Sequence, residues 1–241
     1  MGLRNEKDRM NGPSYRRRGR IAPDTTDSLT LNTPVLPYSA ELKRKAIHLS
    51  ALAIPIGLLI VERPTALLVL VPLALFALAC NVASQRIELV HRFMMRIFRP
   101  IMRPSELPPF GGPVVLNGAT WMCISAALCA LLYNAPVAAA VLIMLMVGDG
   151  AAAIIGRRFG THRFPGSDKS WEGSIAFFLT AVLVALPLTL PILMNSLGHA
   201  PLSNLQIGVG ALLSAVLEAL PIPLNDNVRV PVLAGLAMSF V

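Results

Sequence analysis

The sequence predicts an all-α integral membrane protein with about seven transmembrane helices, and its composition, the lengths of its apolar segments and its charge distribution each favour this class. Of the 241 residues, 54% are hydrophobic and 14% are charged, and the mean hydropathy is +0.63. A soluble domain of this length needs more polar surface than that. Several stretches are apolar for the ~20 residues that a bilayer-spanning helix requires.

Seven apolar segments are candidate spans. They cover residues 46–61, 65–83, 114–133, 135–155, 173–194, 205–220 and 230–241. The first segment is short and contains Pro55, and the last is short as well. Asn117 and Thr120 are polar positions within the third segment, where we expect hydrogen bonds to a neighbouring helix.

Two further regions lie outside these spans. Residues 1–38 are rich in Arg, Pro, Asp, Thr and Ser, and they hold too little apolar material for a core, which predicts a disordered basic cytosolic tail. Residues 39–241 are then the transmembrane domain. Between the second and third spans, bulky apolar residues alternate with Arg92, Arg96, Arg99 and Arg103. This pattern predicts one interfacial amphipathic helix on the membrane surface.

The basic residues define an orientation. With the N-terminus in the cytosol, 20 of the 21 Lys and Arg residues fall in cytosolic segments, and only Arg63 lies outside them. This asymmetry predicts a cytosolic N-terminus and an odd number of spans. It also accounts for the net charge of +8, so nucleic acid is not an expected partner. The three cysteines lie in apolar segments without metal-ligand spacing and are interpreted as packing residues.

Two carboxylates, Asp149 and Glu218, lie within or beside apolar spans. An acid inside a membrane costs several kcal/mol unless it is paired, hydrated or metal-bound, so each is a candidate functional residue. Around Asp149, small residues recur on one helical face and allow another backbone or a ligand to approach closely. Simple helix packing is the alternative explanation of this stripe. Its members are Gly148, Ala152, Gly156 and Gly160.

A polar loop, residues 166–174, precedes the fifth span. It is not a P-loop, because Gly and Lys are not adjacent and no strand precedes it. Lys169, the neighbouring hydroxyls and the N–H groups of a helix start nevertheless suit a phosphate. A capped helix with Lys and Trp anchors at the membrane interface is the alternative.

Polar side chains also flank the first and sixth spans. Glu218 ends the sixth span, and Pro221 and Pro223 break the helix before residues 225–227, whose carboxyl and amide groups can fold back towards Asp149. Before the first span, four residues at i, i+3, i+4 and i+7 share one helical face. They are Glu41, Arg44, Lys45 and His48. Anchoring at the membrane surface explains the two basic residues better than it explains the glutamate and the histidine.

Carboxylates for a hard cation, basic groups for phosphate oxygens and a neighbouring lipid phase together indicate phosphoryl transfer at the membrane surface. Such a reaction depends mainly on positioning and charge neutralisation, typically with Mg²⁺.

The ordered set of motifs resembles the dolichol kinase/phytol kinase family, which includes the CTP-dependent diacylglycerol kinase of fungi. The resemblance covers roughly residues 40–241, and residues 149–174 are its most specific part. The motifs are Glu41-(x)2-Arg44-Lys45-(x)2-His48, Gly148-Asp149-Gly150-Ala151 with Gly156 and Gly160, Lys169-Ser170-x-Glu172-Gly173-Ser174, and Glu218 with Asp226-Asn227.

The resemblance implies a kinase that uses CTP or another nucleoside triphosphate to phosphorylate a membrane lipid alcohol of the phytol, polyprenol or dolichol type. It implies catalytic roles for Asp149, Lys169, Glu218 and Asp226, with Asp149, Glu218 and Asp226 as ligands of Mg²⁺ or another divalent cation. The expected nucleotide-binding residues are Gly148, Gly150, Gly156, Arg157, Gly160, Lys169, Ser170, Glu172, Gly173 and Asn227. Arg44, Lys45 and His48 are expected on the phosphate side, and the alcohol is expected to enter from the bilayer past the small-residue stripe. The short chain favours a phytol-type substrate.

Two other functions remain alternatives. A phosphatidate cytidylyltransferase also uses CTP to modify a lipid in the membrane, but its Lys-Asp…Asp-Arg-x-Asp signature is not visible in the sequence. An ion-coupled transporter would use buried acids as relays, but here the charged groups gather at one surface.

Overall fold

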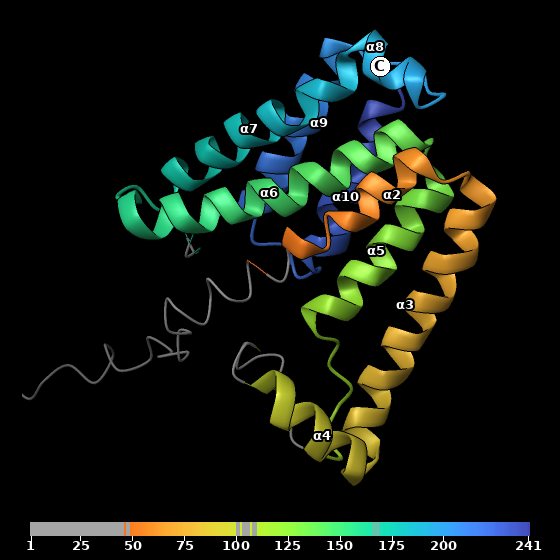
Figure 1. Cartoon of the computed structure of the whole chain (residues 1–241). Coiled ribbons are helices and arrows are strands. Elements are labelled where there is room, and N and C mark those ends of the chain that lie inside the picture. The colour runs from red at the N-terminus through yellow and green to blue at the C-terminus, as the bar shows by residue number, and fades with distance from the viewer. Residues whose placement is uncertain are drawn as a thin grey trace, which may run out of the picture. The chain divides into compact units, whose positions relative to one another are not determined.

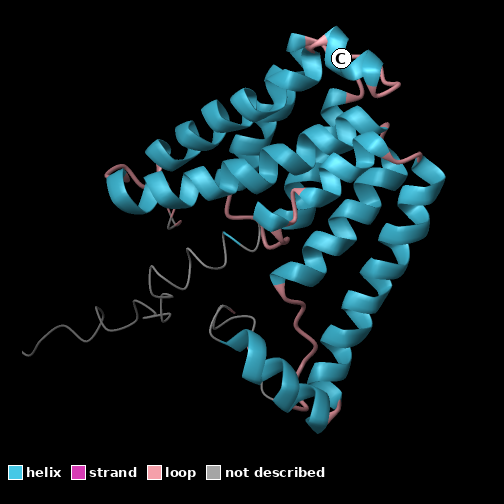
Figure 2. Ribbon diagram, viewed as in Figure 1, coloured by secondary structure: helices cyan, strands magenta, loops and turns pink. Residues whose placement is uncertain are grey.

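The computed structural model describes residues 46, 49–99, 102, 107, 110–165, 167 and 169–241. In that part of the chain every regular element is a helix, and the single β-type contact is an isolated bridge between Arg163 and Ser170 (Figure 2). The prediction of an all-α protein is confirmed. The predicted tail, residues 1–38, lies outside the described residues and stays a prediction.

The helices follow one another along the chain, and the longest connection, residues 99–117, joins α4 to α5 (Figure 1). They are α2 (Ala53–Ile60), α3 (Arg63–Arg86), α4 (Glu88–Phe98), α5 (Gly118–Leu132), α6 (Ala135–Phe159), α7 (Trp171–Ala185), the 3₁₀ helix η4 (Leu186–Thr189), α8 (Pro191–Ser196), α9 (Asn204–Ala219) and α10 (Asp226–Met238).

Three helical segments of the described chain are long and apolar enough to cross a bilayer: Arg63–Arg86, Ala135–Phe159 and Trp171–Thr189. Shorter apolar helices are Gly118–Leu132 and Asn204–Ala219. Many large apolar side chains of α3 and α7 are exposed, which suits a lipid environment. The chain is therefore an all-α membrane protein, whereas the predicted number of seven spans is not confirmed. The segment predicted over 173–194 is divided, because α7 gives way to η4 and then to α8.

Side-chain caps define five of the ten helix starts in the described residues. A side-chain oxygen of the N-cap residue accepts a hydrogen bond from the first helical turn of α5, α6, α7, α9 and α10, which satisfies backbone donors that lack a partner within the helix. These N-cap residues are Asn117, Asn134, Ser170, Ser203 and Asn225. The helix boundaries are thus encoded locally by the sequence.

Helix α6 is the central element, because it contacts α2, α5, α7, α9 and α10 (Figure 1). The small-residue stripe of α6 faces α7. A Cβ added at Gly148 would lie 2.9 Å from ring atoms of Phe177, and one added at Gly156 would lie 3.1 Å from Ser170 Oγ. Gly173 in turn lies against the carbonyl of Ala152. The stripe is therefore a helix-packing surface, and the path of the alcohol past it stays a prediction.

A polar network joins α3 to α5. Asn81 Nδ2 donates to the carbonyl of Val115 at 2.8 Å, and the backbone N–H of Asn117 donates to Asn81 Oδ1 at 3.2 Å. Thr120 Oγ1 lies 3.4 Å from the same Asn81 oxygen. The expected interhelical hydrogen bond is confirmed for the Thr120 side chain, whereas the Asn117 side chain caps α5 and only its backbone N–H reaches α3. Their partner, Asn81, is a residue that the sequence did not single out.

Helix α4 has the amphipathic pattern expected between the second and third spans. None of its residues is buried; the exposed apolar residues Leu89, Phe93 and Ile97 recur every four positions, and Glu88 and Arg92 pair on another side of the helix. His91 Nδ1 lies 2.9 Å from the carbonyl of Ser84, which joins α4 to the end of α3 across the bend at Ile87. The amphipathic helix is confirmed as an element, and its place at the membrane surface remains an expectation.

Candidate active site

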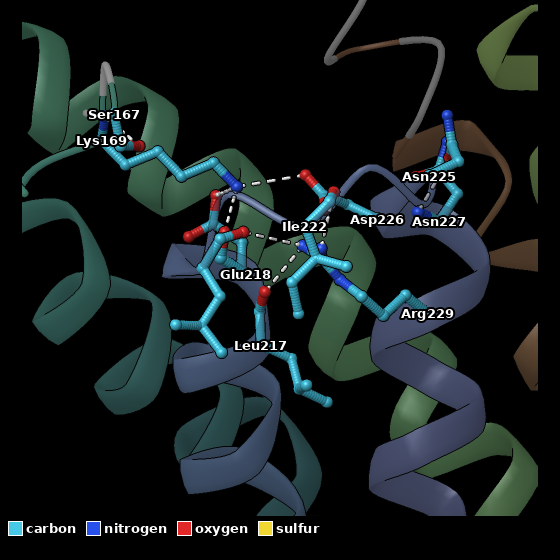
Figure 3. Close-up of polar contacts among 10 residues, drawn as sticks. Ser167, Lys169, Leu217, Glu218, Ile222, Asn225, Asp226, Asn227 and Arg229 are labelled. Atoms are coloured by element: carbon cyan, nitrogen blue, oxygen red, sulfur yellow. Dashed lines mark hydrogen bonds and ion pairs between the residues drawn. The ribbon is translucent and has the colours of Figure 1, made fainter.

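The termini of several helices meet at one end of the described bundle. The C-terminus of α9, the N-terminus of α10 and the loop from α6 to α7 contribute side chains there (Figure 3). The loop is held by backbone hydrogen bonds from Phe164 to the carbonyl of Lys169, at 3.0 Å, and from Trp171 to that of His162, at 2.9 Å. Lys169 thus lies in a loop that backbone hydrogen bonds hold in place.

Lys169 lies between two carboxylates (Figure 3). Its Nζ is 2.8 Å from Glu218 Oε1 and 3.1 Å from Asp226 Oδ2, and it also donates to the backbone carbonyl of Glu218. The side chains of Lys169, Glu218 and Asp226 are 30%, 9% and 43% exposed, respectively. The cluster is therefore buried on the Glu218 side and open on the Asp226 side.

Asp149 and Arg229 complete the charged cluster. Asp149 is half-buried in α6, and its carboxylate interacts electrostatically with that of Glu218. Arg229 donates to Asp226 Oδ1 from a side chain that is 2% exposed. Asp149, Lys169, Glu218 and Asp226 thus lie in one cluster, while their catalytic roles stay a prediction. With all five groups ionised, three acids and two cations leave a formal charge of −1.

The carboxylates do not form a ready metal site. Over the described ranges, no group of three or more His, Cys, Asp or Glu side chains is arranged to hold a metal ion. The Lys169 ammonium occupies the space between Glu218 and Asp226 that a cation would need. Carboxylate oxygens are the ligands that Mg²⁺ prefers. The donor chemistry is therefore suitable, but the three-carboxylate ligand set of Asp149, Glu218 and Asp226 stays a prediction.

Glu172 is engaged within the loop. Its Oε1 accepts from Thr161 Oγ1 at 2.7 Å and lies 2.8 Å from His162 Nδ1, and the backbone N–H groups of both residues also donate to it at 3.2 Å. These contacts join the end of α6 to the first turn of α7. The structure thus gives Glu172 a bracing contact, while its expected role in nucleotide binding stays a prediction.

The remaining predicted nucleotide-binding residues occupy four settings. Ser170 caps α7 by accepting from the N–H of Gly173 at 3.2 Å, and both lie in the α6–α7 contact together with Gly156 and Gly148. Gly160 ends α6 beside Ser170, and Arg157 is exposed on the last turn of α6.

The two other predicted residues lie apart from this contact. An added Cβ at Gly150 would meet open space. Asn227 Nδ2 donates to the carbonyl of Gly118 at 3.2 Å, which links α10 to α5.

Other predicted residues cannot be placed. Arg44, Lys45 and His48 lie outside the described residues, so their position on the phosphate side stays a prediction. Conversely, sequence reasoning missed the roles of Thr161, His162 and Arg229. An i, i+3 pair of opposite charge, Asp226 and Arg229, was the one sequence signal for the last of these.

Comparison with known proteins finds partial similarity to several of them. An uncharacterized protein of Rickettsia prowazekii is 28% identical over 149 residues, which is 62% of this chain and 71% of that protein. The dolichol kinase of Saccharomyces cerevisiae is 39% identical over 101 residues, 42% of this chain and 18% of the kinase. The phytol kinase of Synechocystis is 38% identical over 99 residues, 40% of this chain and 41% of the kinase.

The similarity is confined to part of each named kinase, since the chain spans well under half the length of the dolichol and phytol kinases that it matches. No protein-family model and no solved structure matches the chain. The matches to the named kinases agree with the family that the sequence motifs resemble. The chain is therefore similar to parts of dolichol and phytol kinases.

Proposed function

We propose that this protein transfers the γ-phosphoryl group of a nucleoside triphosphate to the hydroxyl of a polyprenol-type lipid alcohol in the membrane. The observation that carries the proposal is the position of Lys169 between Glu218 and Asp226, beside Asp149, at one end of an apolar helix bundle. An ammonium group suits phosphate oxygens, and carboxylates suit a metal ion or a hydroxyl proton. The partial similarity to named dolichol and phytol kinases supports the same reaction.

The exchange of partners by Lys169 is the central step of this proposal. When Lys169 donates to the oxygens of the bound triphosphate, Glu218 and Asp226 lose their ammonium partner. One carboxylate then accepts the proton of the lipid hydroxyl as its oxygen attacks the γ-phosphorus. The bond to the β-phosphate oxygen breaks, which releases a nucleoside diphosphate and leaves a lipid monophosphate. The divalent cation arrives as part of the metal–nucleotide substrate, for which Asp149 is the proposed ligand.

Three finer assignments belong to the proposal. CTP is the expected donor and Mg²⁺ the expected metal, because the motifs resemble CTP-dependent lipid alcohol kinases. A phytol-type alcohol is the expected acceptor, in line with the similarity to the phytol kinase of Synechocystis. The site is expected to face the cytosol, since nearly all Lys and Arg residues fall in the segments assigned to that side.

Two radiolabels test the reaction. The protein is reconstituted with phytol, farnesol, dolichol or diacylglycerol and given CTP, ATP, GTP or UTP labelled at the γ- or α-phosphorus. Transfer of γ-label to lipid supports the kinase, and Glu88→Gln, which changes an exposed acid of α4, is the matched control for Glu218→Gln. Transfer of α-label to lipid would replace the kinase with a cytidylyltransferase. Ion flux without nucleotide turnover would indicate a transporter.

A further inference from the structure

Arg229 lies in the first turn of α10 and is nearly completely buried, although nothing in the proposed chemistry requires a buried arginine. Its NH1 donates to the carbonyl of Ile222 at 3.0 Å, and its NH2 donates to those of Leu217 and Leu220 at 2.7 and 3.2 Å. These carbonyls belong to the end of α9 and the turn after it, where backbone acceptors lack helical partners. Arg229 therefore ties the end of α9 to the start of α10.

The same guanidinium also holds a carboxylate of the candidate site. Asp226 presents one oxygen, Oδ1, to Arg229 and the other, Oδ2, to Lys169 (Figure 3). Glu218, the second partner of Lys169, lies next to Leu217, whose carbonyl Arg229 binds. Both carboxylates that flank Lys169 are thus attached to segments that Arg229 joins.

We infer that Arg229 is a positioning residue, which orients Asp226 and the end of α9 so that Lys169 and the two carboxylates meet. This inference rests on the proposed function and deepens it. Arg229 acts through Asp226 and does not itself contact substrate. The planar guanidinium reaches three carbonyls and a carboxylate at once, whereas a lysine ammonium offers a single point with three donors. Arg229→Lys should therefore preserve the charge and lose the geometry.

The chain offers a matched control in Arg63. Arg63 Nε donates to the carbonyl of Ala130 at 3.1 Å, and its NH2 donates to that of Leu131, at the end of α5. It thus binds the carbonyls at a helix C-terminus as Arg229 does, but at the opposite end of α5 from the contact between Asn227 and Gly118. Arg63→Lys measures what the loss of such a cap does to stability alone.

The first measurement is the acylation rate of the Lys169 amine in the full chain in nanodiscs, followed by mass spectrometry. Arg229→Lys should raise this rate roughly two- to five-fold, the effect of losing a partly exposed ion pair, because Asp226 is no longer aimed at Lys169. Arg63→Lys should leave the rate unchanged. Arg229→Gln, whose amide still donates to carbonyls without carrying charge, gives the same expectation if the lysine variant does not fold.

The second measurement is a double-mutant cycle for lipid phosphorylation. Arg229→Lys alone should lower kcat by about 10- to 100-fold, as for other residues that orient a functional side chain. Added to Asp226→Asn, it should lower kcat no further, because both changes break the same link. Additive losses of kcat in the double variant would overturn the inference, as would equal rates of Lys169 acylation in Arg229→Lys and Arg63→Lys. If the wild type shows no turnover, the proposed function is wrong, but the acylation rates still decide the role of Arg229.

Discussion

Replacing Lys169 with methionine separates the contribution of its charge to stability from its contribution to catalysis. The substitution keeps the apolar stem of the side chain and leaves Glu218, with 9% of its side chain exposed, without its ammonium partner. Breaking a fully buried ion pair costs about 3–5 kcal/mol. Lys169 and Asp226 are 30% and 43% exposed, so water compensates in part and we expect a loss of about 2 kcal/mol. For a chain of this size that corresponds to a fall in Tm of roughly 4–8 °C.

The double variant Lys169→Met/Glu218→Gln should recover most of this Tm, because a neutral amide does not need a cation beside it. Its phosphorylation of lipid alcohol should remain about 10²- to 10³-fold below wild type, the usual effect of removing a positioned charge. Thermal unfolding in detergent and transfer of γ-label are measured on the same preparations. Near-normal turnover in Lys169→Met, or turnover restored in the double variant, would refute the role given to this lysine.

Three further predictions concern other parts of the bundle. Gly148→Ala should lower the free energy of unfolding by about 1–3 kcal/mol, because the new Cβ would meet the Phe177 ring. Gly57→Ala is the control, since its Cβ would meet open space, and the Tm of the two variants is compared with that of the wild type. Asp149→Asn should abolish transfer of γ-label while leaving membrane insertion intact, as judged by carbonate extraction, and near-normal turnover would remove Asp149 from the site. Asn81→Leu should lower the free energy of unfolding by about 1–3 kcal/mol by leaving the groups that bridge α3 and α5 unpaired, and an unchanged Tm would contradict this.

Much of the candidate site was readable from the sequence because the relevant residue types are costly in an apolar setting. Asp149 and Glu218 stood out for that reason, and the loop with Lys169 stood out as a polar helix start. The structure brings these residues together with Asp226. The glycine stripe had two explanations in the sequence, and its contact with α7 favours helix packing. A spacing of four predicts that residues share a face, but it does not identify what covers that face.

The prediction of seven spans shows a different limit. Apolar composition predicts a membrane environment, but it does not distinguish a continuous helix from one interrupted by prolines. Pro187 lies in the 3₁₀ turn after α7, and Pro191 begins α8, so a single predicted segment contains three helical pieces. Only helices of sufficient length span a bilayer unaided, and three of the described segments have that length.

The sequence by itself determined the membrane class of this protein, encoded the side-chain caps at which several helices begin, and singled out the acids and the lysine of the candidate site. Each of these depends on local composition or on neighbours within one helical turn. Only the tertiary structure decided which charges become partners, because Lys169 meets Glu218 and Asp226 across 49 and 57 positions of the chain. It also decided that Arg229 is buried, since burial depends on how α9 packs against α10 and not on the residues beside it in the sequence.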